Sequence, residues 1–188
     1  MSKKTINIKN MVCPRCVAAV KDTLTKVDIK FYSVSLGEAV VEEQNLNYDL
    51  LDKELKKIGF ELINDNNKKI TEQVKSVIIE HIHLNNYEVL SINFSSVISE
   101  KLEKDYSYIS KIFSDTEQIT IEKFIILQKI EKVKELISYD ELSFSEISYL
   151  LNYSSPAHLS KQFKDITGFT LSQYKKQTNK QRKTLDNL

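Results

Sequence analysis

The residues of this sequence best suited to chemistry are Cys13 and Cys16, three positions apart in a loop at residues 10–16. The loop leads into a predicted helix, and a helix N-terminus favours thiolate over thiol. Two soft thiolates with no third ligand close by suit Cu(I), which accepts low coordination and prefers sulfur, better than Zn²⁺, which takes four ligands. His81 and His83 are two positions apart on a predicted helix, point in different directions, and do not complete a zinc site. The two cysteines therefore predict a Cu(I) site, and Zn²⁺ is the less suited ion.

Other uses of the cysteine pair stay open. It could serve as a thiol redox sensor, or both thiols could be structural and inert. The chain has only two cysteines, which excludes a secreted disulfide framework. A thioredoxin-like interpretation rests on Cys13-Pro14-Arg15-Cys16 alone, and the loop lacks the aromatic residue that usually precedes the first cysteine of that family. The sequence has no Ser-His-Asp set, phosphate loop or carboxylate pair, so an enzyme is not expected.

The composition fits a protein with packed cores and a soluble surface. At 188 residues, with 41% hydrophobic and 28% charged residues, the chain could form one domain or two small ones. Its apolar runs fall short of the ~20 residues needed to cross a bilayer, and its N-terminus leads into no secretory segment. A cytoplasmic protein with no membrane partner is therefore expected.

The net charge of +1 is weak support for a nucleic-acid binder, since such domains often have a pI above about 9. The charge is unevenly distributed, however. After Ser155, only Asp165 and Asp186 oppose the basic residues Lys161, Lys164, Lys175, Lys176, Lys180, Arg182 and Lys183.

The first 64 residues carry strand and helix patterns in turn. They predict a strand at 4–9, a helix with the stripe Val17, Val20, Leu24 and Val27, strands at 31–36 and 39–42 joined at Gly37, a helix with the stripe Leu50, Leu51, Leu55 and Ile58 closed by Gly59, and a strand at 60–63. The order βαββαβ is the ferredoxin-like arrangement. We therefore expect an α+β fold that begins with a ferredoxin-like domain.

With Met11-Val12-Cys13-Pro14-Arg15-Cys16 in its first loop, the segment 4–64 resembles the heavy-metal-associated domain of copper chaperones and copper-pumping ATPases. The resemblance implies that Cys13 and Cys16 bind metal and that Phe60 closes over the site. The family usually has Gly-Met-Thr before the first cysteine, whereas this chain has Asn10-Met11-Val12. The loop therefore departs from the family pattern at two of these three positions.

Residues 64–69 are polar and rich in turn-forming types, which predicts a boundary between two domains. The first domain is expected at 1–66 and an all-helical domain at 70–178. Residues 179–188 form a basic tail. This tail is interpreted as a solvated helix end or as a phosphate-binding segment.

A helix-turn-helix pattern stands out in the second half of the chain. Ser143 and Glu146 form a predicted capping box at the start of one helix. Residues 152–155 break the helical pattern, and Ser155-Pro156 restarts it with an N-cap followed by proline, up to Gly168. The stripe of Leu159, Phe163 and Ile166 leaves outside a face of small or polar residues that reach base edges and phosphates: Ala157, His158, Lys161, Gln162 and Lys164.

The same pattern occurs earlier in the chain. Residues 108–115 match residues 158–165, and Thr120 and Phe124 match Thr170 and Tyr174, each displaced by 50 positions. Between the copies, a predicted linker helix runs from Thr120 to about residue 138. It spans roughly 27 Å at 1.5 Å per residue, against about 34 Å between successive major grooves on one side of DNA.

With these two units, residues from about 71 to 176 resemble the DNA-binding domain of AraC-family transcription regulators. The resemblance implies double-stranded DNA as partner and RNA polymerase as a candidate partner. One chain should suffice for a site, because two units replace a dimer. Asp105 and Asn152 stand where the family often has glycine in the turn, and Gln118 replaces the glycine found at 168. The contact positions of the family correspond to Ser107, Tyr108, Ser110 and Lys111 in the first unit and to Ala157, His158, Lys161 and Gln162 in the second.

The two resemblances on one chain predict a sequence-specific DNA-binding transcription regulator that responds to a soft metal ion such as Cu(I). The main alternative is a metal carrier or binding protein whose helical half docks a protein partner rather than DNA. A thiol redox sensor is another. The helical half could also be a bundle whose outer faces are only solvated.

Overall fold

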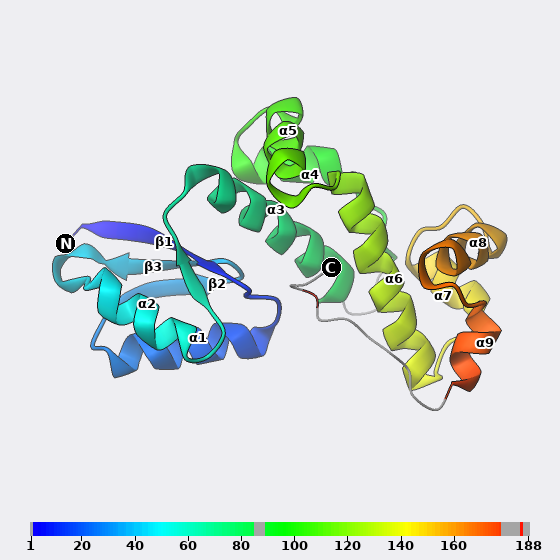
Figure 1. The fold of residues 1–188 in the computed structure, drawn as a ribbon, viewed down its shortest axis with the longest axis horizontal. Coiled ribbons are helices and arrows are strands. Elements are labelled where there is room, and N and C mark those ends of the chain that lie inside the picture. The colour runs from blue at the N-terminus through cyan, green and yellow to red at the C-terminus, as the bar shows by residue number, and fades with distance from the viewer. Residues whose placement is uncertain (1, 85–88, 178–184, 186–188) are drawn as a thin grey trace.

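The computed structural model describes residues 2–84, 89–177 and 185. It has a mixed α+β architecture, with a four-stranded sheet and its helices in the first part and a helical second part (Figure 1). The first part consists of β1 (Lys3–Lys9), α1 (Pro14–Lys26), β2 (Phe31–Ser35), β3 (Glu38–Glu42), the 3-10 helix η1 (Glu43–Asn45), α2 (Tyr48–Lys56) and β4 (Glu61–Ile63). The second consists of α3 (Asn66–His83), α4 (Phe94–Leu102), α5 (Tyr106–Glu117), α6 (Ile121–Tyr139), α7 (Phe144–Leu150), α8 (Pro156–Thr167) and α9 (Leu171–Lys176).

The sheet has the strand order β2-β3-β1-β4, and each neighbouring pair is antiparallel. Alternation along β1 puts Ile6 and Ile8 into one hydrophobic core with residues of α1 and α2. Two residues of the predicted stripe of α2 are not part of this core, because Leu50 is 44% and Ile58 is 45% exposed. Ile58 lies beyond the last residue of α2, in the turn that Gly59 completes with a φ of +86°.

The predicted polar linker at 64–69 is wrong for its last four residues, because α3 begins at Asn66. Asp65 caps this helix, and its carboxylate accepts a hydrogen bond of 2.9 Å from the amide of Lys68. An aspartate within a polar run starts a helix as readily as it makes a turn. Asn64 and Asp65 therefore join β4 to α3, and the domain limits at 66 and 70 stay predictions.

Helix α6 connects two separate hydrophobic cores. Ile121 and Phe124, near its N-terminus, are buried in one core with α3, α4 and α5, whereas residues from Ile130 to Ile137 are buried in another with α7, α8 and α9. Thr120 caps the helix as predicted, accepting a hydrogen bond of 3.1 Å from the amide of Lys123. Its 19 residues make a rod about 28 Å long, with α4 and α5 near one end and α7, α8 and α9 near the other (Figure 1).

The sheet part docks on α3 through two close contacts. The β2–β3 turn lies so close to α3 that a Cβ on Gly37 would be 2.6 Å from the hydroxyl oxygen of Ser76. Val12, from the cysteine loop, packs against the core that α3 shares with α4, α5 and α6. The two parts of the chain therefore meet over a specific surface and are not merely tethered.

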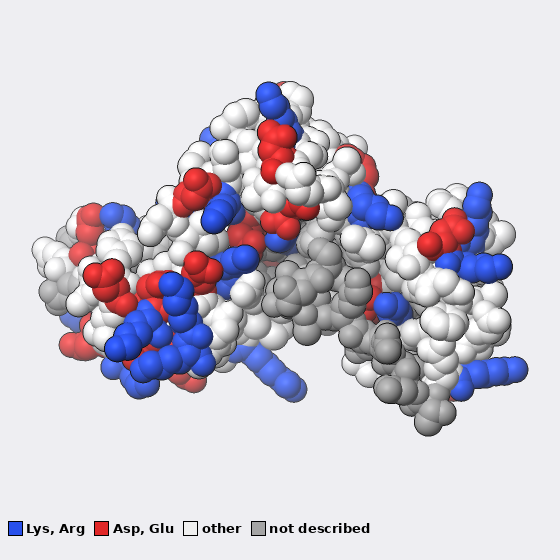
Figure 2. All heavy atoms as spheres, viewed as in Figure 1, with Lys and Arg blue, Asp and Glu red and all other residues white. Residues whose placement is uncertain are grey.

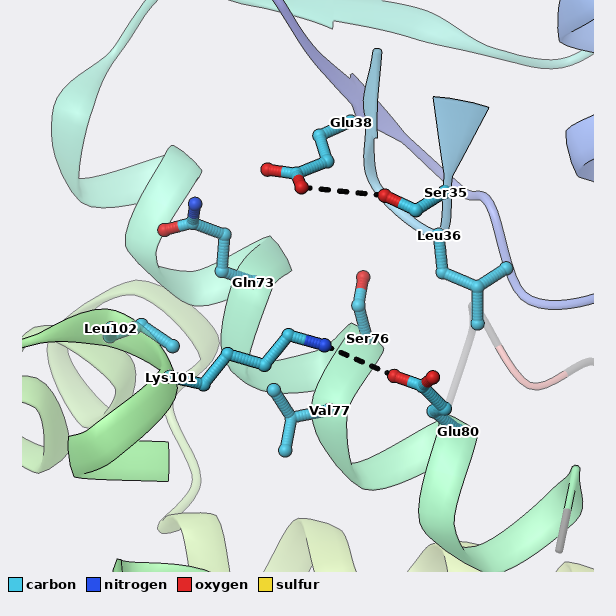
Figure 3. A pocket seen from close by; sticks show the side chains of 9 residues that line it. All are labelled: Ser35, Leu36, Glu38, Gln73, Ser76, Val77, Glu80, Lys101 and Leu102. Atoms are coloured by element: carbon cyan, nitrogen blue, oxygen red, sulfur yellow. Dashed lines mark hydrogen bonds and ion pairs between the residues drawn. The ribbon is translucent and has the colours of Figure 1, made fainter. Parts of the chain in front are cut away.

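A cavity of about 130 Å³ lies at this junction. Figure 3 shows the β2–β3 turn facing α3 and the end of α4 across it, with Lys101 extended toward Glu80. The amine of Lys101 is 3.1 Å from a carboxylate oxygen of Glu80, and Ser35 donates to Glu38 at 3.4 Å.

Within the described ranges, no helix has the length and apolar character needed to cross a membrane.

Candidate nucleic-acid interface and metal site

The second helix-turn-helix unit, α7 and α8, is built by the local signals that the sequence predicts. Ser143 and Glu146 form the capping box of α7, with the Ser143 amide donating to the Glu146 carboxylate at 2.7 Å. The Ser143 side chain and its amide together lower the pKa of Glu146. Helix α8 begins with Ser155 as N-cap and proline as its first residue, and it ends at Gly168, whose φ is +78°. The predicted bounds of this unit are confirmed.

The predicted contact residues of α8 lie on its outer side. Ala157, His158 and Lys161 are exposed, Gln162 is half-buried, and the alternate face is buried through Leu159 and Phe163. The His158 ring lies 2.9 Å by Nδ1 from the Ser154 hydroxyl. Gln162 accepts a hydrogen bond of 2.8 Å from the Tyr153 hydroxyl. Residues of the turn before α8 therefore form hydrogen bonds with two of the four predicted contact residues of this helix, His158 and Gln162.

The first unit, α4 and α5, has a shorter turn. The left-handed residue is Glu103, with φ +52°, whereas Asp105 has φ −62° and serves as N-cap of α5. The prediction that Asp105 occupies the glycine position of the turn is therefore wrong. The left-handed residue and the N-cap are 103 and 105 in this unit but 152 and 155 in the second. One residue fewer in the turn moves the aspartate onto the cap, where its carboxylate bonds the first amides of α5.

The outer side of α5 carries the other predicted contact residues. Ser107, Tyr108 and Lys111 are exposed, with Tyr108 at 48%, and Ser110 is half-buried. Ser107 also donates from its hydroxyl and its amide to Asp105, and these bonds lower the pKa of Asp105.

At the end of α5, Gln118 replaces glycine and nevertheless adopts the left-handed conformation, with a φ of +59°. Whether any of the residues on α5 or α8 contacts DNA stays a prediction.

Basic side chains are spread over both parts of the molecule. On the face shown in Figure 2, Lys and Arg gather over the region of α1 and α2, and further groups lie over α8 and α9. Lys175 of α9 pairs with Asp140, at the end of α6. The predicted basic tail at 179–188 lies outside the described residues, apart from Leu185.

Cys13 and Cys16 lie together where the first loop meets α1. Cys13 is the N-cap of the helix, and the two sulfur atoms are 3.2 Å apart, both half-buried and not disulfide-bonded. Burial raises the pKa of Cys13, but the Cys16 thiol, the amides of Cys16 and Arg15 and the Arg15 charge together lower it below its ordinary value. Burial and the neighbouring Cys13 raise the pKa of Cys16. As the pH rises, the Cys13 thiol therefore loses its proton before the Cys16 thiol does.

The rest of the cysteine loop is tied to the turn before β4. Asn10, with a φ of +72°, donates from its side-chain amide to the carbonyl of Gly59 at 3.0 Å. The next residue, Phe60, is 8% exposed and belongs to the core that Cys16 borders. The loop and the turn containing Phe60 therefore form one local structure.

The donor set fits a soft ion in low coordination, because it offers two adjacent sulfurs. In the part of the chain that the structure describes, no group of three or more His, Cys, Asp and Glu residues is placed to hold a metal ion. His81 and His83 are engaged elsewhere, with the carbonyl of Val77 and the side chain of Gln128, each at 2.8 Å.

Comparisons with known proteins bear on the second half of the chain. Residues 98–177 match the family model described as "Helix-turn-helix domain". The Msm operon regulatory protein of Streptococcus mutans is 29% identical over 114 residues, which are 61% of this chain and 38% of that relative. Among solved structures, the C-terminal domain of AraT, a response regulator from Geobacillus stearothermophilus, aligns with a TM-score of 0.48 and 21% identity over 59% of this chain and 87% of that one.

The family match covers both units, from Ile98 in α4 to Gln177 after α9. The C-terminal half of the chain is therefore a helix-turn-helix DNA-binding domain of the AraC type. The chain spans 38% of the length of the curated relative.

Proposed function

We propose that this chain is a sequence-specific DNA-binding transcription regulator whose affinity for DNA changes when Cys13 and Cys16 bind a soft metal ion such as Cu(I). The observation that carries the proposal is the pair of helix-turn-helix units joined by α6, each with polar residues on the outer side of its second helix. The relative named as an operon regulatory protein supports it.

One chain is proposed to place α5 and α8 in two adjacent major grooves. The length of α6, about 28 Å, is close to the groove repeat of about 34 Å. Double-stranded DNA is then the principal partner, and no second protomer is needed for a site. RNA polymerase is a further partner of the proposal, and the cytoplasm is the proposed location. Lys161, exposed on α8, is the residue best placed to bond guanine or a phosphate.

The N-terminal part is proposed to be a ferredoxin-like, heavy-metal-associated domain. Its element order and its sheet order β2-β3-β1-β4 support this assignment. Cys13 and Cys16 would hold the metal, and Phe60, tied to the same loop through the Asn10 bond to Gly59, would shield it from water. Cu(I) fits two thiols better than Zn²⁺ does.

Coupling between metal and DNA is proposed to act on the first helix-turn-helix unit. Val12 directly precedes the metal-binding Cys13 and packs against the core that contains Ile109 and Phe113, the buried residues of α5. A shift of the loop on metal binding would therefore be felt at the inner face of α5. Linked sites typically couple by about 1–3 kcal/mol, and linkage makes the effect reciprocal, so target DNA must change Cu(I) affinity by the same factor.

A selection on random duplex DNA, with and without Cu(I), tests this proposal. We expect enrichment of one sequence family at low salt and a change in its affinity with Cu(I) that Cys13→Ser together with Cys16→Ser abolishes. Lys161→Ala should weaken binding by about 1–3 kcal/mol if the residue reads a base, or reduce the salt slope by about one unit if it meets phosphate. Lys53→Ala, at an exposed position of α2, is the control. Without any enrichment, the regulator proposal fails.

An exposed apolar hollow favours the second candidate function, a metal-binding protein whose helical half docks a protein partner. Tyr149 of α7 is 71% exposed, and with Val89, Leu142 and Leu150 it lines a shallow depression. Exposed apolar surface of this kind marks protein interaction sites. A thiol redox sensor is tested in the same selection, because oxidation instead of Cu(I) would then change DNA affinity.

A further inference from the structure

We propose that Tyr153, in the turn between α7 and α8, is a positioning residue that sets the base preference of the second unit by orienting the Gln162 side chain. This inference rests on the proposed DNA-binding function. Tyr153 is not one of the predicted contact residues, and its own hydroxyl is directed at α8.

The hydrogen bond between the two side chains fixes which end of the amide faces outward. The Tyr153 hydroxyl donates to Oε1 of Gln162 at 2.8 Å. With its oxygen held toward the turn, Gln162 presents its NH₂ group, which carries two donors. A glutamine that rotates freely can use both its oxygen and its nitrogen to bond adenine. Gln162 held in this way instead offers donors, which suit the O6 and N7 acceptors of guanine or the O4 acceptor of thymine.

Tyr153 is itself held from two sides. The amine of Lys129, on α6, donates to the carbonyl of Leu151 at 2.8 Å and lies 5.3 Å from the centre of the Tyr153 ring. That distance is within the range of a cation–π interaction. The His158 ring meets the Tyr153 ring edge to face, with centres 5.4 Å apart. A chain of contacts therefore runs from the linker helix through Tyr153 to two predicted contact residues of α8.

The protonation states suit these roles. Burial raises the pKa of Tyr153, so its hydroxyl stays protonated and able to donate at neutral pH. Burial lowers the pKa of Lys129. The Lys129 amine can donate to the Leu151 carbonyl whether or not it is charged, whereas its attraction to the Tyr153 ring needs the charged form.

The first unit lacks this arrangement at the equivalent position. The repeat aligns Gln162 with Ile112, which is 8% exposed and belongs to the hydrophobic core beneath α5. A buried isoleucine cannot read a base edge. The orienting bond is therefore specific to the second unit, and its loss should change only the half of the DNA site that this unit contacts.

The test is a selection on random duplex DNA with the wild type, Tyr153→Phe, Gln162→Ala and the double variant, using the full chain. Tyr153→Phe removes one hydroxyl and keeps the ring. It should shift the preference at one base pair by about tenfold or more toward adenine, at the same base pair that Gln162→Ala relaxes. In the Gln162→Ala background, Tyr153→Phe should have no further effect on preference. Tyr139→Phe, at a tyrosine that is 56% exposed at the end of α6, is the control and should leave every preference unchanged.

The possible outcomes separate this inference from the proposed function. If the wild type enriches a sequence and Tyr153→Phe keeps all its preferences, the positioning role is refuted while DNA binding stands. A uniform loss of affinity over all sequences would also refute it, since that result indicates a purely structural tyrosine. If the wild type enriches no sequence, the proposed function fails and this inference fails with it.

Discussion

Replacing Gly37 with alanine tests the docking of the sheet part on α3. Gly37 has a φ of +79°, where an L-residue costs about 1–2 kcal/mol. The new Cβ would also lie 2.6 Å from Oγ of Ser76, which is only 8% exposed. Overpacking at a buried position typically costs a further 1–3 kcal/mol. We therefore expect Gly37→Ala to lower the free energy of unfolding by about 2–5 kcal/mol.

Gly59→Ala is the matched control, because Gly59 has a φ of +86° but no atom within 4 Å of the new Cβ. It should cost only the conformational part, about 1–2 kcal/mol. Ser76→Ala should rescue Gly37→Ala, because the nearest remaining atoms would lie 3.7 Å and 3.9 Å away, at ordinary contact distance. The double variant should therefore resemble Gly59→Ala.

Urea unfolding of the wild type, Gly37→Ala, Gly59→Ala and the double variant Gly37→Ala with Ser76→Ala measures these differences through the midpoint and the slope of the transition. The reasoning is refuted if Gly37→Ala costs no more than Gly59→Ala, or if Ser76→Ala fails to rescue it. Either result would mean that the β2–β3 turn does not lie against α3 in solution.

Three further predictions concern the helical half and its connection to the cysteine loop. Gln118→Gly should stabilise the chain by about 1 kcal/mol in thermal or urea unfolding, because Gln118 has a φ of +59°; an unchanged or lower stability would contradict this. The Tyr106 hydroxyl donates to Glu122 at 2.8 Å and lowers the pKa of Glu122. Tyr106→Phe should therefore lower the free energy of unfolding at pH 7. The difference from the wild type should shrink as the pH falls through the lowered pKa of Glu122, because the carboxylate then takes up its proton. A difference that is constant with pH would contradict this prediction. Val12→Ala should reduce the effect of Cu(I) on DNA affinity, because Val12 contacts the core beneath α5. It should leave the Cu(I) affinity of the chain without DNA unchanged, because Val12 supplies no thiol. Full retention of the Cu(I) effect in a metal-buffered titration would exclude coupling through Val12.

The helix ends could be predicted from sequence because short-range chemistry decides them. The capping box of Ser143, the Ser155-Pro156 start of α8 and the Gly168 end each need only residues within one turn of helix. The repeat added what composition could not, namely that two such units occur on one chain. The strands about Gly37 followed from alternation and one glycine.

The errors arose where a polar residue has two local uses. Asp65 and Asp105 both suit turns, and both are helix N-caps in the structure. The competing use won because each carboxylate is followed by amides that it can bond, and the next apolar residues, Ile70 and Ile109, are buried by the helix that results. The sequence carries a sign of this difference, since Ile98-Ser99 match Ile147-Ser148 at a displacement of 49 positions, whereas residues 108–115 match residues 158–165 at a displacement of 50.

Contacts between distant segments could not be predicted at all. The packing of Val12 against the core beneath α5, the approach of Gly37 to Ser76 and the support of Tyr153 by Lys129 join residues that are far apart in the chain. Family resemblance supplied the eight predicted contact residues, and it could not show that the turn before α8 holds His158 and Gln162. These long-range contacts are the ones on which the proposed coupling and the proposed base preference depend.

The central claim is that one chain reads two neighbouring segments of duplex DNA, and a methylation-interference footprint on a selected duplex tests it most directly. With one chain bound per duplex, the account predicts two groups of interfering guanines about one helical turn apart. A single group of interfering guanines, or two chains bound to every duplex, would contradict it.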